Sequence, residues 1–206
     1  MNNPIRGLIQ KRLEAPRLKS LCNGRADSIL EIGCGQGAGA RIIGDLFSPK
    51  KYVGIDLDSK MVERAKKKEH GLKNALFLQV DAARLPFGDG TFDLAVDFGI
   101  IHHIPNWREA LAEIHRTLNA HGELYFEELP VETWERGIGK PLKRLLEHPY
   151  KDMFRQTEFV AELERLGFEV ELYEDSLASL YYFWGRARKT LPLRPGQSPS
   201  DQKGIQ

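Results

Sequence analysis

Residues 28–47 read SILEIGCGQGAGARIIGDLF, a short apolar run that leads into a glycine-rich turn and then into a helical pattern. Ser28 to Ile32 is typical of a buried strand. The turn that follows contains Gly33, Gly35 and Gly37. Glycine has no Cβ atom, so the backbone can bend sharply here and approach a ligand closely. The helix predicted near Ala40 to Phe47 would direct its free N–H groups at that ligand.

Apolar runs and helical patterns continue to alternate after this stretch. Further strands are predicted at Tyr52 to Ile55, Ala75 to Val80, Phe92 to Phe98 and Gly122 to Leu129. Helices are predicted from Ser59 to about Glu69 and from Trp107 to Leu118. Strands that alternate with helices of this length predict an α/β fold, with a parallel sheet covered on both faces. Ligands of such sheets bind beyond the carboxyl ends of the strands.

The regular alternation of strand and helix patterns stops after residue 129. Residues 130–153 are typical of an insertion, with a short helix predicted near Leu142 to Leu146. Beyond it, Thr157 is expected to cap a helix that Gly167 ends. Two last strands are predicted at Phe168 to Tyr173 and at Leu177 to Ala187. Residues 191–206 are expected to form a disordered tail, because the chain holds almost no apolar residue from Arg194 onward.

The composition is that of one ordinary globular domain. A length of 206 residues is enough for one full core but not for two complete domains. The 30 Lys and Arg nearly cancel the 29 Asp and Glu, so no overall field recruits nucleic acid. Cys22 and Cys34 match neither a disulfide framework nor a metal-ligand spacing, which favours a reducing, cytoplasmic location and no required metal. No apolar run approaches the roughly 20 residues that span a bilayer, and the start is too polar for a secretory signal.

Acidic residues follow the second and third predicted strands, where ligands of such sheets bind. Asp56 ends the second strand, and a carboxylate there can accept hydrogen bonds from both hydroxyls of a ribose. The alternative for Asp56 is a turn before the next helix, but Asp58 is the better cap and would leave Asp56 free. Asp81 ends the third strand. Beside an apolar wall from Leu57 and Leu85, its carboxylate would suit an adenine amino group.

Four segments occur in an order and spacing that are typical of one protein family. They are the spaced glycines from Glu31 to Gly37, the segment Gly54 to Asp58, the segment Asp81 to Phe87, and Phe92-Asp93 with His102-His103. Together they resemble class I S-adenosylmethionine-dependent methyltransferases, in particular the small branch of the ubiquinone and menaquinone biosynthesis methyltransferases. The resemblance covers residues 26–128 well. It implies a Rossmann-like three-layer α/β/α sandwich, with seven strands in the order 3-2-1-4-5-7-6 and the last strand antiparallel.

The resemblance also implies which residues bind the cofactor, S-adenosylmethionine, and its product, S-adenosylhomocysteine. The glycine-rich turn would pass beneath the methionine part. Asp56 would hold the ribose, and Phe98 would offer its backbone carbonyl to the amino group. The cofactor-binding residues are therefore expected to be Glu31, Gly33, Cys34, Gly35, Gly37, Asp56, Leu57, Asp81, Ala82, Phe98 and His103. Cys34 is common at its position in this family and need not be a nucleophile.

Methyl transfer from a sulfonium depends mainly on alignment, and it needs a base only when the acceptor must lose a proton. His102 and His103 lie beyond the fourth strand and are candidate catalytic bases, because imidazole titrates near neutral pH. The alternative is that they pack or hydrogen-bond without chemistry. Glu127 and Glu128 end the fifth strand as second candidates, with surface carboxylates beside a loop as the alternative.

Residues 1–24 form a basic amphipathic segment ahead of the expected methyltransferase domain, residues 25–190. In related enzymes this region is often a lid over the acceptor. It can equally pack on the domain with solvated charges, or touch an anionic membrane surface. Aromatic residues in the insertion and the last strand suit a small acceptor that is apolar or lipid-like. The protein is expected to be a monomer or a homodimer.

Two other functions stay open at this level. An NAD-dependent oxidoreductase shares the glycine-rich turn followed by an acid, but it leaves no room for a substrate domain and no role for Asp81. A sensor or scaffold that binds S-adenosylmethionine without catalysis is the second, because the sequence pattern assigns no base.

Overall fold

The computed structural model describes residues 14–22, 26–68, 70–135, 153–177 and 180–190. The strands are β1 Ser28–Ile32, β2 Lys51–Asp56, β3 Ala75–Gln79, β4 Phe92–Asp97, β5 Leu118–Glu128, β6 Phe168–Leu177 and β7 Leu180–Lys189. The helices are α2 Ala15–Leu21, α3 Ala38–Phe47, α4 Ser59–Lys66, the 3₁₀ turn η2 Ile101–His103, α5 Trp107–Thr117, α6 Val131–Glu135 and α8 Gln156–Arg165.

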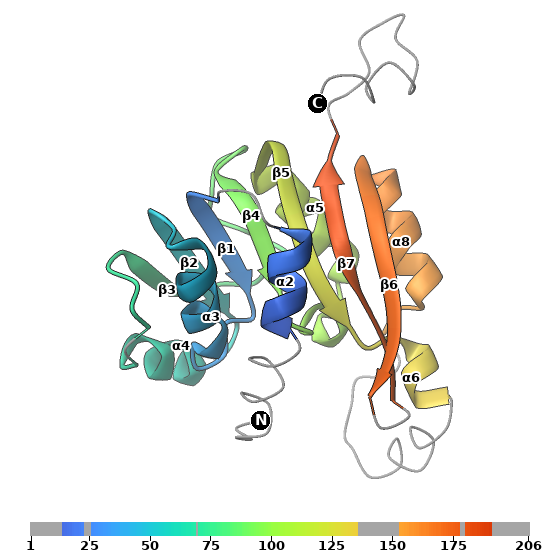
Figure 1. Cartoon of the computed structure of the whole chain (residues 1–206), viewed down its shortest axis with the longest axis horizontal. Helices are drawn as coiled ribbons and strands as arrows, with labels where there is room; N and C mark the ends of the chain where they lie inside the picture. The colour runs from blue at the N-terminus through green and yellow to red at the C-terminus, as the bar shows by residue number, and fades with distance from the viewer. Residues whose placement is uncertain (1–13, 23–25, 69, 136–152, 178–179, 191–206) are drawn as a thin grey trace, which may run out of the picture.

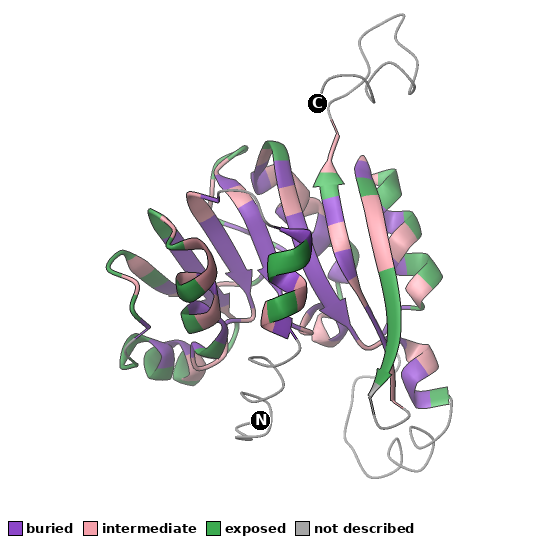
Figure 2. Cartoon of the chain, viewed as in Figure 1, coloured by how far each residue is buried: buried purple, intermediate pink, exposed green. Residues whose placement is uncertain are grey.

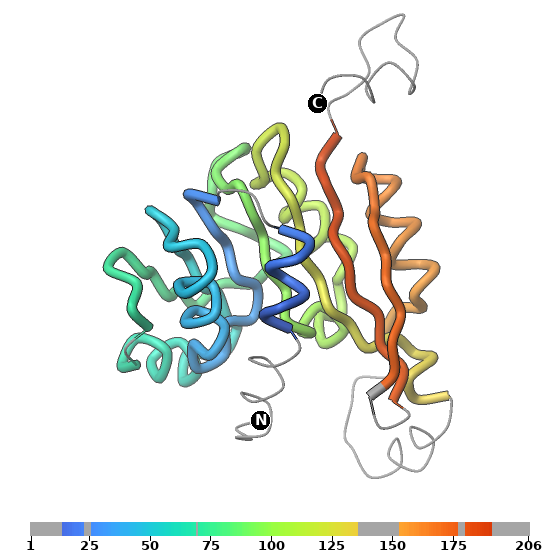
Figure 3. Tube along the Cα trace, in the orientation of Figure 1, coloured from blue at the N-terminus to red at the C-terminus, as the bar shows by residue number. Residues whose placement is uncertain are grey.

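The strands form one sheet of seven in the order β3-β2-β1-β4-β5-β7-β6 (Figure 1). Only β7 runs antiparallel to its neighbours, β5 and β6, and the other pairs are parallel. Helices α2 and α3 cover one face, and α5 and α8 cover the other. These observations confirm the predicted fold class, strand order and direction of the last strand. The trace in Figure 3 runs from β1 out to the β3 edge and returns to β4, so the strand order reverses between β1 and β4.

Each face of the sheet has its own apolar core, because successive strand residues point to opposite faces. In β1, Ile29 packs in the core beneath α2, α3 and α4, whereas Leu30 packs in the core beneath α5 and α8. Both side chains are fully buried. The central strands are buried over most of their length, while the edge strand β6 carries exposed residues (Figure 2). This two-sided burial explains why the central strands are rich in apolar residues.

Several element boundaries differ from the sequence-based expectations. Asp58 caps α4 as expected and accepts a hydrogen bond from the Lys60 N–H at 2.8 Å, but this helix ends at Lys66. The expectation that Thr157 caps α8 is wrong. The cap residue is Arg155, because its N–H donates to the side chain of Glu158, at the third helical position, over 2.8 Å.

The strands also extend further than predicted, since β5 begins at Leu118 and β6 continues to Leu177. Gly167 follows α8 with a φ of +93°, a left-handed conformation suited to the predicted helix end. The predicted helix at 142–146, the tail at 191–206, and much of the insertion and of the N-terminal segment lie outside the described residues. No helix in the described ranges combines the length and apolar character that crossing a membrane requires.

Candidate functional site

A cavity of about 240 Å³ lies beyond the carboxyl ends of β1, β2 and β3, next to the point where the strand order reverses. Six residues predicted to bind a cofactor line it, namely Gly33, Asp56, Leu57, Asp81, Ala82 and His103. A larger and more open hollow of about 590 Å³ lies between α4 and β3, where Lys66, Lys68 and Lys73 line it. None of the predicted residues lies there, so the cavity at the strand ends is the candidate site.

The three glycines of the turn have left-handed backbone conformations, with φ of +64° at Gly33, +52° at Gly35 and +81° at Gly37. A Cβ atom on Gly33 would lie 2.4 Å from a side-chain carbon of Ile100, and one on Gly37 would lie 2.5 Å from the ring of His70. A Cβ atom on Gly35 would meet no atom within 4 Å. The protein's own packing therefore requires two of these glycines, whereas Gly35 leaves room for a ligand.

Asp56 ties the glycine turn to the start of α4. One carboxylate oxygen accepts a hydrogen bond from the Gly35 N–H at 2.9 Å, and the other accepts one from the Asp58 N–H at 2.9 Å. The expectation that Asp58 alone would serve the turn and leave Asp56 free is therefore wrong. A carboxylate has about four acceptor positions, so the side chain retains capacity for further donors in the cavity.

Asp81 and Leu57 form the outer part of the cavity. Asp81 is exposed and accepts a hydrogen bond from the Ala83 N–H at 3.0 Å. Leu57 is 70% exposed, which is unusual for a large apolar side chain. The predicted apolar wall from Leu57 and Leu85 is only half right, because Leu85 is buried in the core and does not line the cavity. Ile104 completes the wall instead.

Three predicted cofactor residues lie behind the cavity wall. Glu31 is 2% exposed, and its carboxylate accepts a hydrogen bond from the Tyr52 hydroxyl. Burial raises the pKa of Glu31 to about 8. Cys34 is buried, and that burial raises the pKa of its thiol, which does not favour a nucleophile. The ring of Phe98 is buried edge-on against Tyr125. Only its backbone carbonyl is therefore relevant to the predicted contact with the cofactor's amino group.

The two candidate bases differ in their access to the cavity. Both lie on η2, and their ring centroids are 4.2 Å apart. His103 lines the cavity, whereas His102 is 3% exposed beneath it. The ring nitrogen Nδ1 of His102 is hydrogen-bonded to the carboxylate of Glu128. Only His103 is therefore in a position to contact a bound molecule directly.

Glu127 and Glu128 are not the surface carboxylates that the sequence suggested as the alternative, since their exposed fractions are 9% and 1%. Burial raises the pKa of Glu128 to about 7, although hydrogen bonds from Asp97 and from backbone N–H groups act in the opposite direction. The strand β5 ends inside the molecule, between α2 and η2. Both carboxylates are therefore held in place by other elements.

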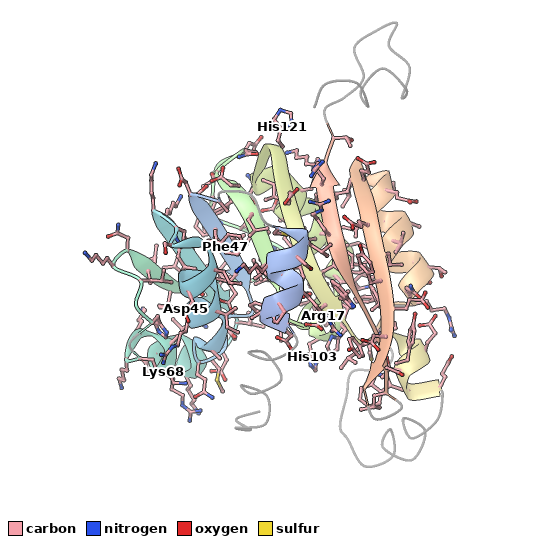
Figure 4. All side chains as sticks on the ribbon, in the orientation of Figure 1. Arg17, Asp45, Phe47, Lys68, His103 and His121 are labelled. Carbon is pink, nitrogen blue, oxygen red and sulfur yellow. The ribbon has the colours of Figure 1, made fainter. Side chains whose placement is uncertain are left out.

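Arg17 of α2 is the centre of a side-chain cluster, outside the cavity lining, that sequence reasoning did not single out. Its guanidinium donates hydrogen bonds to Glu127 at 2.7 Å, to Asp175 at 2.8 Å and to the Tyr182 hydroxyl at 2.7 Å. It also lies 4.8 Å from the ring centroid of Trp184. Figure 4 shows Arg17 and His103 at the same end of the sheet. No sequence signal could reveal this cluster, because one partner of Arg17 lies at the end of β5 and the other three lie in the last third of the chain.

Metal ligation has no support in the ranges that the structure covers. Within them, no three residues of His, Cys, Asp and Glu gather as metal ligands would. Asp97 and the His102 ring are engaged in the hydrogen bonds of the η2 turn.

Comparisons with known proteins add to this geometry. Residues 30–126 match the family model described as a methyltransferase domain. Over 122 residues, the chain is 33% identical to the phthiotriol/phenolphthiotriol dimycocerosates methyltransferase of Mycobacterium tuberculosis, a match that covers 57% of this chain and 45% of the relative. It is 34% identical over 122 residues to the fatty-acid O-methyltransferase of Mycolicibacterium smegmatis, covering 57% and 44%. The chain thus spans less than half the length of these relatives.

Solved structures share the fold. A SAM-dependent methyltransferase from Methanosarcina mazei superimposes with a TM-score of 0.64 at 23% identity, covering 82% of this chain and 95% of that one.

Proposed function

We propose that the protein transfers a methyl group from S-adenosylmethionine to a small, lipid-like acceptor, because residues 30–126 match the model of a methyltransferase domain. The family match confirms the class that the sequence resembles, and S-adenosylmethionine is the cofactor of that class. The observation that carries the proposal is the cavity at the ends of β1 to β3, where Gly35 leaves open space beside the carboxylate of Asp56.

The residues of this cavity fit an adenosyl group. Asp56 would hold the ribose hydroxyls with its remaining acceptor positions. Asp81 and Ala82 would contact the edge of the adenine, and the exposed side chain of Leu57 would cover its face. Burying Leu57 in this way would remove apolar surface from water, which favours binding. The backbone at Gly35 would lie against the methionine part, with Glu31, Cys34 and Phe98 supporting the turn from behind.

The bound cofactor supplies a methyl group already activated by a sulfonium, so the protein's main task is alignment. Holding an acceptor in line can contribute roughly 7–11 kcal/mol through effective concentration. His103 lies at the cavity edge beyond β4, where it can orient the acceptor. With a phenol, an enol or a protonated amine it would also take up the proton.

The class of acceptor is supported by two observations. The names of the relatives describe a fatty acid and dimycocerosates, which are lipid-like molecules. In this chain, aromatic residues of β7, Tyr182 and Trp184, lie next to Arg17 at the end of the sheet where the acceptor would enter. Aromatic side chains provide large apolar contact surfaces for such a molecule.

Calorimetry with S-adenosylhomocysteine and with NAD tests the cofactor. We expect binding of the former alone, and a properly folded chain that ignores S-adenosylhomocysteine would contradict the proposal. Asp56→Ala should weaken binding at least about tenfold, because it removes a ribose acceptor and releases the Gly35 N–H. Asp45→Ala is the matched control, since Asp45 is exposed on α3 away from the cavity (Figure 4). Transfer of labelled methyl to a long-chain fatty acid and to a phenolic lipid then tests the acceptor class.

A further inference from the structure

Glu128 ends β5 inside the molecule, where its carboxylate holds the turn that carries both histidines. One oxygen accepts a hydrogen bond from the Ile101 N–H at 2.7 Å, and both oxygens lie 3.3 Å from the His102 backbone nitrogen. The second oxygen also bonds Nδ1 of the His102 ring. Backbone N–H groups at the start of a helical turn have no partner within the turn, so this carboxylate caps η2 from another strand.

Asp97, at the end of the neighbouring strand β4, holds the residue just before the turn. Its carboxylate accepts a hydrogen bond from the Ile100 N–H at 2.9 Å, and Asp97 is also hydrogen-bonded to Glu128. Asp97 is fully buried and Glu128 is 1% exposed. A hydrogen bond between two carboxyl groups requires a proton on one of them, and burial favours that state. Three consecutive backbone N–H groups, 100 to 102, are thus fixed by the ends of two strands.

The position of His103 follows from this arrangement. Its N–H donates to the Ile100 carbonyl at 2.9 Å, and its ring lies against the ring of His102 with centroids 4.2 Å apart. His102 is in turn held by Glu128. Only His103 of the pair lines the cavity. The His103 ring is thus linked, through His102, to a carboxylate that does not itself line the cavity.

We propose that Glu128 is a positioning residue for methyl transfer, which acts with Asp97 and His102 to direct His103 into the cavity. The inference rests on the proposed function, because it assigns His103 the acceptor side of that site. A displacement of about 1 Å in a reacting group can lower a rate about a hundredfold, so a rigid support for His103 has a direct effect on turnover.

Nuclear magnetic resonance of the two histidine rings tests the support without any acceptor. In the wild-type chain we expect Nδ1 of His102 to carry the proton and to donate it to the buried Glu128 carboxylate, which would give a strongly deshielded Nδ1–H signal. Glu128→Gln offers one acceptor oxygen instead of two, so it cannot serve both the Ile101 N–H and the His102 ring. This variant should shift the ring signals of His103, whereas Glu127→Gln, on the opposite face of the same strand, should leave them unchanged. Unchanged His103 signals in Glu128→Gln would overturn the proposal.

Kinetics with a long-chain fatty acid or a phenolic lipid, whichever is methylated, distinguish positioning from general stability. Glu128→Gln should lower kcat roughly 10–100-fold, with its affinity for S-adenosylhomocysteine within about twofold of wild type. In a His103→Ala background, Glu128→Gln should not lower kcat any further, because the two substitutions remove the same interaction. Additive losses, or a His103→Ala enzyme with full turnover, would refute the role of Glu128. A chain that binds no S-adenosylhomocysteine would instead refute the proposed function, and the ring signals would still decide whether Glu128 positions His103.

Discussion

The candidate site lies at the edge of the sheet formed by the strand ends, and the β1–β3 half and the β4–β7 half of this edge are held together by different kinds of contact. On the β1–β3 side, the contacts involve backbone groups and stay within one strand–helix–strand unit, as where Asp56 bonds the Gly35 N–H 21 positions away or the Asp58 N–H two positions away. On the β4–β7 side, side chains bond one another over long separations, as where Arg17 bonds Glu127 at 110 positions and Tyr182 at 165. Local backbone contacts leave a recognisable motif in the sequence, and long-range side-chain contacts do not.

The halves also differ in how their charges are solvated. The acids of the β1–β3 side that line the cavity are partly or fully exposed, whereas Asp97, Glu127 and Glu128 on the other side are buried. A buried charge is costly unless it is paired or hydrogen-bonded. We therefore expect substitutions in the glycine turn to lower the free energy of unfolding through steric clashes and backbone strain. Substitutions on the β4–β7 side should lower it by removing partners of buried charged groups.

The largest expected effect is that of Gly33→Ala. The new Cβ atom would lie 2.4 Å from Ile100, and the residue would retain a φ of +64°. Overpacking and the left-handed conformation together should lower the free energy of unfolding by about 2–5 kcal/mol. Denaturant unfolding measures this loss.

Gly35→Ala is its matched control within the same turn. Its Cβ atom meets no protein atom within 4 Å, so the cost is limited to about 1–2 kcal/mol for the left-handed backbone. The same Cβ atom should weaken binding of S-adenosylhomocysteine measured by calorimetry. Equal losses of stability in the two variants would contradict the distinction between packing glycines and the ligand-facing glycine.

Arg17→Ala is expected to have the next largest effect. It removes the hydrogen bonds from the guanidinium to Glu127, Asp175 and Tyr182, and the buried carboxylate of Glu127 loses this charged donor. Unfolding free energy should fall by about 2 kcal/mol, while affinity for S-adenosylhomocysteine stays at the wild-type value, because Arg17 does not line the cavity.

Arg165→Ala provides the comparison, since the Arg165 side chain is 65% exposed and its partner Glu162 also has a second cation, Arg108, at 3.9 Å. Its loss should change unfolding free energy by no more than about 1 kcal/mol. If Arg17→Ala were as mild as Arg165→Ala, the long-range cluster would contribute little to the β4–β7 side.

A last expected effect is a change in the pH dependence of stability at Glu31. Its pKa is raised from the usual 4.5 to about 8 by burial, so the folded chain binds more protons than the unfolded chain between these values. The stability contribution of Glu31 therefore falls as the pH rises through that window. Glu31→Gln keeps an acceptor for the Tyr52 hydroxyl but cannot ionise. Thermal unfolding should show a gain in Tm over wild type that is larger near pH 9 than near pH 5, and an equal gain at both would contradict the buried state of this carboxyl.

Particular residues show which features of the fold and of the site could be predicted from the sequence. The strand at Ser28–Ile32, the turn that follows it and the cap at Asp58 were all predicted, because each depends on neighbours within a few positions. The predicted cap at Thr157 was wrong, since the Glu158 side chain accepts a hydrogen bond from the Arg155 N–H and α8 therefore begins directly after Arg155. Leu85 was placed at the cavity but lies in the core, because its side-chain direction depends on the packing of α5 against the sheet.

The sequence by itself determined the class of fold, the order of its strands through the family resemblance, and the edge of the sheet at which a ligand is expected, because these follow from local periodicity and from a turn that only glycine permits. Only the tertiary structure decided that Glu128 caps η2, that His103 rather than His102 reaches the cavity, and that Arg17 joins α2 to β5, β6 and β7. These contacts join residues between 26 and 165 positions apart, and their geometry exists only after the strands have come together.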